Sequence, residues 1–126
     1  MLHIEDAEHA ESSPEAPHLV VSKLVCSLVG STETVTLLPG TLAGLAYGVN
    51  QASESFACNY GLNPDYREPL FQGKLKVSGF GPDGEVRLVE LEGSKFFVGT
   101  LFLPQVNSTE EKPHPLIVEF IRTADV

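Results

Sequence analysis

Residues 39–58 are the only long stretch of this chain in which apolar side chains recur at the spacing of an α-helix. The apolar stripe consists of Leu42, Leu45, Val49, Ala52 and Phe56. A Pro-Gly pair precedes Thr41, a residue type that caps helix N-termini, and an Asn-Tyr-Gly sequence follows residue 58 as a stop signal. We therefore predict one helix over residues 41–58, with its apolar face packed in the core.

Most of the remaining sequence is typical of β-strands. Strands are predicted at residues 18–29, 33–38, 70–80, 85–92, 96–103 and 116–121. The first two are expected to form a hairpin through a Gly-Ser turn. The three strands between residues 70 and 103 are expected to form an antiparallel meander, with a bulge at Val89. The predicted fold class is α+β, in which a curved antiparallel sheet wraps around a single central helix. The alternative is an all-β sandwich in which residues 41–58 do not form one helix.

The 126 residues carry a formal net charge of −9 that is unevenly distributed. Residues 1–17 contain five acidic residues and no Lys or Arg, so we predict a disordered acidic tail there and a single domain over residues 18–126. The eight Lys and Arg residues form no basic stripe, which argues against nucleic-acid binding.

Several classes of site are not expected from this sequence. No apolar run is long enough for a membrane helix, and the first residues do not resemble a signal peptide, so the prediction is a soluble cytoplasmic protein with no membrane association. Cys26 and Cys58 are expected to be reduced rather than joined in a disulfide. The four histidines have no metal-ligand spacing, so neither a metal site nor a cofactor is expected.

Three segments resemble a known family. Residues 18–25 with the turn at 30–32, the Pro-Gly pair before the helix, and residues 67–75 resemble the 3-hydroxyacyl-ACP dehydratases of the hot-dog superfamily. The resemblance implies a homodimer that binds an acyl thioester of coenzyme A or of acyl carrier protein. However, the dehydratases carry a histidine just before their long helix, and this chain has none between His18 and His114. Tyr47 stands where they have an acidic residue. Dehydratase activity is therefore not expected, and thioesterase activity is the enzymatic alternative.

Thioester hydrolysis needs a donor to the carbonyl oxygen and a group that activates or positions water. The candidate catalytic residues are Asn50, Gln51 and Glu54, the last being the only acid in the predicted helix. The candidate substrate-binding residues are Gly44, Tyr47, Gly48 and Arg67. The alternative is that these polar residues line a solvent or dimer face, and that the protein is a non-catalytic structural or ligand-sensing module.

Overall fold

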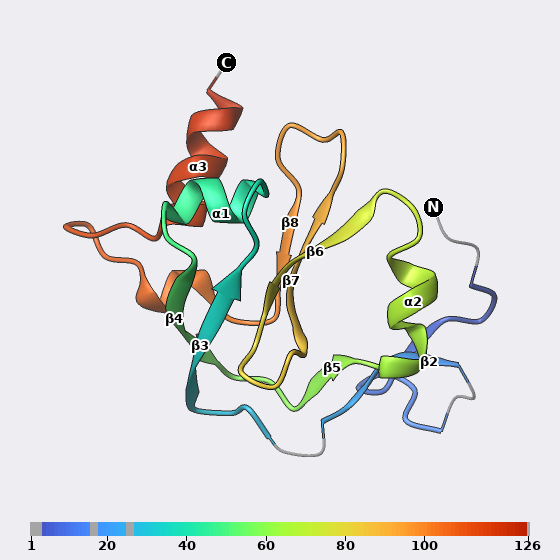
Figure 1. Cartoon of the computed structure of the whole chain (residues 1–126). Helices are drawn as coiled ribbons and strands as arrows, with labels where there is room; N and C mark the ends of the chain where they lie inside the picture. The colour runs from blue at the N-terminus through green and yellow to red at the C-terminus, as the bar shows by residue number, and fades with distance from the viewer. Residues whose placement is uncertain (1–3, 16–17, 25–26, 126) are drawn as a thin grey trace.

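The computed structural model describes residues 4–15, 18–24 and 27–125, and contains two sheets (Figure 1). The three-stranded sheet has the order β1-β2-β5, with β1 at Glu8–His9, β2 at Leu19–Lys23 and β5 at Tyr60–Leu62. The five-stranded sheet has the order β4-β3-β6-β7-β8. Its strands are β3 (Ser31–Leu37), β4 (Gln51–Phe56), β6 (Leu75–Phe80), β7 (Val86–Leu91) and β8 (Val98–Thr100).

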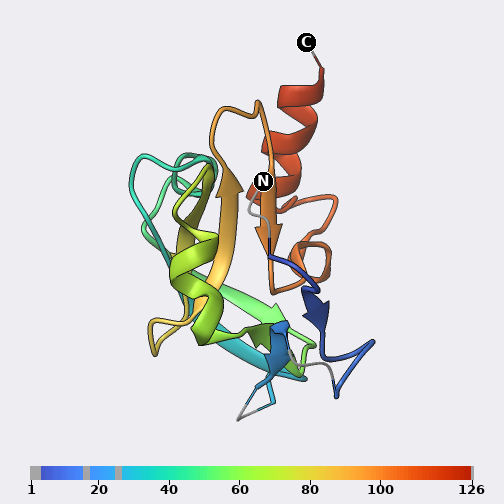
Figure 2. The same ribbon diagram turned by 90° about the vertical axis from the view of Figure 1, so that its right-hand side faces the viewer.

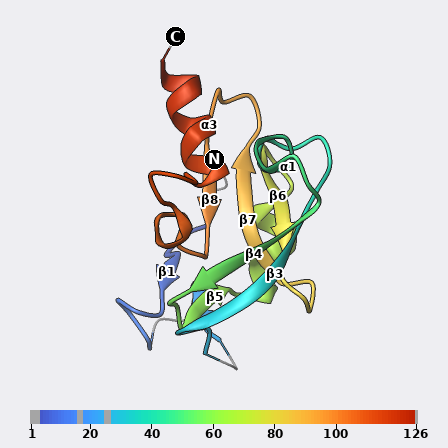
Figure 3. The same ribbon diagram turned by 90° about the vertical axis from the view of Figure 1, so that its left-hand side faces the viewer.

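In the described residues, five short helical segments connect or flank these strands. They are α1 (Leu42–Tyr47), η1 (Pro64–Tyr66), α2 (Arg67–Leu70), η2 (Pro104–Asn107) and α3 (Pro115–Ala124). Figures 1 and 3 place α1 and α3 at one end of the five-stranded sheet, away from the three-stranded sheet. Within the described ranges, no helix is long and apolar enough to cross a membrane.

The predicted meander of three strands is confirmed. β6 pairs with β7 and β7 pairs with β8, both antiparallel, as the short connections indicated. The irregularity lies in β6, on both sides of Gly79, and not at Val89. A Cβ at Gly79 would lie 2.5 Å from the side chain of Leu88 on β7, so the absence of a side chain is what lets the two strands pack closely there.

The predicted long helix is wrong beyond Tyr47. Gly48 adopts the left-handed conformation (φ 69°) and its N–H donates to the carbonyl of Gly44, which ends α1. Residues 51–56 then form β4, in which Ala52 and Phe56 face the same side as the buried Glu54. A spacing of four residues fits both the helical and the strand period, and this coincidence produced the misleading stripe.

The predicted strand at residues 116–121 is also wrong, because these residues lie in α3. His114 caps this helix, since its Nδ1 accepts the N–H of Leu116 at 3.1 Å, and Pro115 occupies the first helical position. The apolar run that follows is rich in β-branched residues and by itself favours a strand. The cap and the proline before it indicate a helix instead.

The predicted hairpin between residues 18–29 and 33–38 does not form either. β2 pairs with β1 and β5, whereas β3 pairs with β4 and β6, so the two segments belong to different sheets. Part of the expected first strand, residues 25–26, lies outside the described residues. In the N-terminal segment, Glu8–His9 pairs with β2 in parallel and Ala10 is buried. The proposed domain boundary at residue 17 stays a prediction.

The core therefore does not surround a central helix. It consists of Leu28, Val35, Leu37, Ala43, Phe56, Leu88, Phe102 and Leu116. Within α1, only Ala43 is fully buried, and Leu45 is 75% exposed. The hot-dog fold class is thus wrong for this chain: two separate sheets replace one continuous curved sheet, and the six-residue α1 lies at the end of one of them (Figure 3).

Candidate functional site

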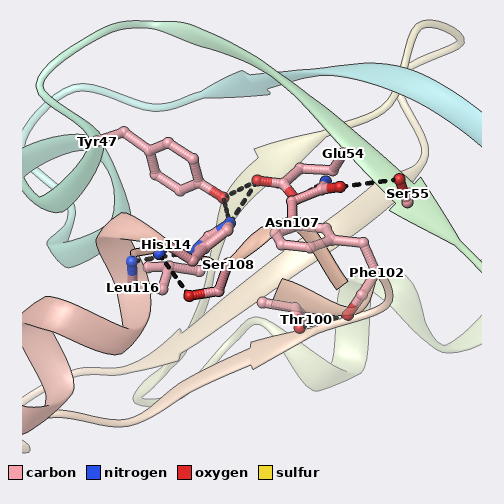
Figure 4. A network of polar contacts seen from close by, with 9 residues as sticks. All are labelled: Tyr47, Glu54, Ser55, Thr100, Phe102, Asn107, Ser108, His114 and Leu116. Atoms are coloured by element: carbon pink, nitrogen blue, oxygen red, sulfur yellow. Dashed lines mark hydrogen bonds and ion pairs between the residues drawn. The ribbon is translucent and has the colours of Figure 1, made fainter. Parts of the chain in front are cut away.

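The most enclosed polar cluster joins Tyr47 at the end of α1, Glu54 on β4 and His114 at the start of α3 (Figure 4). Glu54 is 2% exposed and His114 is 3% exposed. The Tyr47 hydroxyl donates to Glu54 Oε1 at 2.5 Å, and His114 Nε2 lies 2.6 Å from the same oxygen. The consecutive elements α1 and β4 therefore meet the start of α3, 60 positions beyond Glu54, at one carboxylate oxygen.

The local structure explains how each side chain reaches the cluster. The alternation of β4 turns Glu54 into the core, on the same side as Phe56. Tyr47 is the last residue of α1, and its ring meets the ring of His114 edge-on, with centroids 5.3 Å apart. Phe102 packs against both Phe56 and His114, and so closes the apolar side of the cluster.

Both ring nitrogens of His114 are engaged. Because Nδ1 accepts the N–H of Leu116, it carries no proton, and the ring proton lies on Nε2. That proton points to Glu54 Oε1. The imidazole is consequently neutral and has no free lone pair, so it cannot act as a general base toward a substrate while this network is intact.

The second oxygen of Glu54 is also engaged. Glu54 Oε2 accepts a hydrogen bond from Asn107 Nδ2 at 3.3 Å, and Asn107 Oδ1 accepts one from the hydroxyl of Ser55 (Figure 4). The N–H of His114 donates to Ser108 Oγ at 2.9 Å. The cluster thereby fastens η2 and the start of α3 to β4.

The pKa of Tyr47 is raised above its ordinary value of 10.0. Burial is the main cause, and the hydrogen bond to Glu54 and the charge of this carboxylate add to it. The phenol therefore stays protonated at neutral pH and remains a donor to Glu54.

The N-terminus of α1 is occupied by protein groups. The two oxygens of Glu90 accept the N–H groups of Leu42 and Ala43, each at 2.8 Å, and Thr41 Oγ1 accepts the N–H of Gly44 at 3.0 Å. A Cβ at Gly44 would lie 2.4 Å from the carbonyl oxygen of Leu38. Gly44 therefore packs against the backbone, and these amides are not available to a ligand carbonyl.

The remaining sequence-predicted site residues lie elsewhere. Gln51 is exposed at the start of β4, Asn50 is exposed just before it, and Gly48 is the C-cap of α1. Arg67, in α2, donates to the carbonyl of Gly84 and lies over the ring of Phe80. Of the seven candidates, only Tyr47 and Glu54 are joined by a hydrogen bond between side chains, whereas Gly44 and Gly48 are joined by the backbone bond that ends α1.

Sequence reasoning missed His114 as the third member of the cluster. Its signal is the His-Pro pair at the start of an apolar segment, where the imidazole can cap a helix.

The half-buried Cys58 donates its thiol to the carbonyl of Tyr60 at 3.1 Å, and no histidine in the described part of the chain is hydrogen-bonded to it. Cys26, and with it any pairing to Cys58, lies outside the described residues. Across residues 4–15, 18–24 and 27–125, no group of three or more His, Cys, Asp or Glu residues could hold a metal ion.

Comparison with known proteins finds CTP synthases among the sequence relatives, and no family model matches the chain. The chain is 35% identical to a CTP synthase of Dehalococcoides mccartyi and 37% identical to a CTP synthase of Carboxydothermus hydrogenoformans. Each match covers 94% of this chain. It is 44% identical to a CTP synthase of Roseiflexus castenholzii over 70% of its length. The matched segment makes up 24%, 24% and 16% of these three proteins, so the chain spans a quarter or less of their length.

A solved structure has the same fold. It is the glutaminase domain of Trypanosoma brucei CTPS with bound acivicin, which matches this chain with a TM-score of 0.90 at 24% sequence identity. The match covers 98% of this chain and 52% of the other. The described fold is therefore that of about half of the Trypanosoma chain.

These findings overturn the hot-dog resemblance and the function drawn from it. The acyl-thioester function and the coenzyme A and acyl carrier protein partners are wrong, and the expected homodimer loses the resemblance that implied it. Apart from the apolar stretch at residues 18–25, the segments that carried the resemblance are short sequences with Pro or Gly, at residues 30–32, 39–40 and 67–75. Such sequences specify local turns and are shared by unrelated folds.

Proposed function

We propose that this chain is part of a glutaminase domain of the kind found in CTP synthase, in which it helps to bind L-glutamine and to present its side-chain amide for hydrolysis. The observation that carries the proposal is the match over nearly the whole chain, both in fold and in sequence. The match covers about half of the Trypanosoma chain, so the proposal is a part in glutamine binding and not the whole activity of such a domain.

The contacts of Cys58 and His114 are consistent with a chain that helps to bind glutamine but does not carry the catalytic pair in its described residues. Amide hydrolysis by covalent catalysis needs a nucleophile within hydrogen-bonding reach of a base. Cys58 is hydrogen-bonded to a backbone carbonyl, and both ring nitrogens of His114 are engaged. Within the described residues, these two groups do not form such a pair. The cluster at Glu54 holds the framework together and is not proposed as the catalytic pair.

The test uses a chimera in which this chain replaces the matching segment of the Carboxydothermus CTP synthase. L-Glutamine is titrated calorimetrically into the chimera, into the intact relative as a positive control, and into the relative with the segment deleted. The proposal predicts binding by the chimera and none by the deletion variant. A chimera that binds no glutamine would overturn the proposal.

The isolated chain provides a second test. Incubated with L-glutamine, it is expected to release no more ammonia than buffer does. Ammonia release that disappears in Cys58→Ser would place the nucleophile within the chain and contradict the proposed role, in which Cys58 is not the nucleophile.

A further inference from the structure

A small pocket lies where the three-stranded sheet meets the start of β7. It encloses about 130 Å³ and is lined by residues 22–24, by Leu62, Pro64 and Arg67, and by residues 85–87. Figures 1 and 2 both show η1 and α2 (lime green) close to β2 (blue) and β5 (green). Because the lining comes from both sheets, the pocket is a product of the tertiary fold and has no local sequence signal.

One wall of the pocket is an ion-paired cluster around a buried arginine. The side chain of Arg87 is 5% exposed, its Nε lies 3.1 Å from Glu33 Oε1, and its Nη2 lies 3.0 Å from Glu85 Oε2. Among the described residues that line the pocket, the acidic side chain is Glu85. Its negative charge is therefore already engaged by Arg87 within the wall.

Two further cations, Lys23 and Arg67, line the pocket without an acidic partner. Neither of them forms an ion pair with a carboxylate in the described part of the chain. Together with Arg87, they bring three positive charges against the two negative charges of Glu33 and Glu85. The pocket is thus net positive in a chain whose formal net charge is −9, which favours an anionic ligand at this place.

The guanidinium of Arg67 is held in place by two contacts. Its Nη1 donates to the carbonyl of Gly84 at 3.2 Å, and its Cζ lies 5.3 Å from the centre of the Phe80 ring. A guanidinium has five N–H groups, so four of them have no acceptor among the described residues. A positioned guanidinium with free donors loses less side-chain entropy on binding an oxyanion than a freely rotating one does.

We propose that this pocket binds a phosphate group, which is held by Arg67 and Lys23. The free N–H groups of Arg67 and the three of the Lys23 ammonium exceed the roughly four acceptor sites of one carboxylate, whereas a phosphate adds an oxygen and a second charge. The pocket is far smaller than the roughly 300–1,000 Å³ that drug-sized ligands occupy, so it admits the phosphate group alone. The group is inorganic phosphate or the phosphate end of a larger molecule that extends into solvent. This inference goes beyond glutamine binding and does not depend on it.

Titration of the chain with inorganic phosphate at constant ionic strength tests the site. Backbone amide NMR shifts are expected to saturate with a dissociation constant of about 1 mM, because exposed ion pairs are individually weak. The largest shifts are expected at Lys23, Arg67 and Val86, which line the pocket. Shifts that do not saturate at about ten times that concentration, or that saturate only at residues away from the pocket, would overturn the inference.

Matched charge variants separate a built site from general attraction to a cation. Arg67→Gln and Lys23→Gln are each expected to weaken phosphate binding at least about tenfold, with urea midpoints close to that of the parent because both side chains are exposed. Lys95→Gln removes the same charge at an exposed position between β7 and β8, away from the pocket, and should bind phosphate within about twofold of the parent. Equal weakening in all three variants would overturn the inference.

Three probes identify the source of the bound group. Tighter binding of glycerol 3-phosphate than of inorganic phosphate supports the site with a larger phosphate ester as its ligand, and the reverse order supports it with the free ion. Acetate that binds as tightly as both would contradict the assignment to phosphate. The titrations use the chain alone without glutamine, so their failure leaves the proposed function standing, and a chimera that binds no glutamine leaves the phosphate site standing.

Discussion

Glu54 is a buried carboxylate whose oxygens accept hydrogen bonds from three neutral donors. Tyr47 and His114 donate to one oxygen and Asn107 donates to the other. A buried charge is tolerated only where its acceptor sites are satisfied in this way. The cluster therefore ties together α1, β4, η2 and α3, which its four side chains occupy or flank.

Removal of this carboxylate is expected to destabilise the fold severely. Glu54→Ala leaves a hydroxyl, an imidazole N–H and an amide without an acceptor in the core, and should lower the free energy of unfolding by about 3 kcal/mol. Ser53→Ala, at the exposed neighbouring position of β4, should change it by less than about 0.5 kcal/mol. Urea unfolding followed by circular dichroism measures both. Equal stabilities of the two variants would show that the network contributes nothing.

The raised pKa of Tyr47 gives a pH dependence with a definite sign. The folded state holds the phenolic proton more tightly than the unfolded state, whose tyrosine titrates near 10.0. The stabilising contribution is therefore complete below pH 10 and is lost as the pH rises above it. Unfolding measured from pH 8 to 11 should show a steeper loss of stability in the parent than in Tyr47→Phe. Parallel curves would contradict the buried, protonated phenol.

At the scale of the elements, α1 depends on tertiary contacts. A helix of six residues is not stable alone, so its orphan N–H groups need partners from elsewhere. Glu90 supplies two acceptors from β7, and Thr41 supplies one from the cap position. The helix is therefore held in place by the sheet beside it.

This dependence predicts a large effect at Glu90. Glu90→Ala leaves the N–H groups of Leu42 and Ala43 without acceptors and should cost about 2 kcal/mol of stability. Glu92→Ala, at an exposed position two residues later, serves as the matched control and should be close to neutral. Hydrogen exchange of the α1 amides should accelerate only in the Glu90 variant. Unchanged exchange there would mean that other contacts fix the helix.

The elements that sequence reasoning predicted correctly are those set by local signals. The antiparallel meander of β6, β7 and β8 follows from strands joined by short turns. The pairing of β3 with β6 joins residues more than 40 positions apart, and no local pattern encodes it. In residues 51–56, the stripe shared by Ala52 and Phe56 favoured a helix, although the left-handed Gly48 ends α1 before them.

The polar cluster at Glu54 could also be predicted only in part from the sequence. Tyr47 and Glu54 stand out in the sequence as polar residues near an apolar stripe, but their partner His114 lies 60 positions beyond Glu54. Only the placement of α3 against α1 brings it there. Sequence reasoning could name two members of the cluster, whereas the tertiary fold decides that they form a closed hydrogen-bond network.

For the whole molecule, the central fact is the difference in length between this chain and its relatives. The chain has the fold of about half of the Trypanosoma glutaminase chain, and it spans about a quarter of two CTP synthases to which it is 35% and 37% identical. These lengths limit the proposed function to a part in a glutaminase domain and leave the complete reaction of the CTP synthases outside it.

Scanning calorimetry of the chimera with the Carboxydothermus CTP synthase tests this account most directly. If the chain is an integral part of the glutaminase unit, the unit that contains it should unfold in one transition, and L-glutamine should raise the midpoint because it binds only the folded state. A separate transition for this chain, at the midpoint of the isolated chain and unmoved by glutamine, would contradict the account.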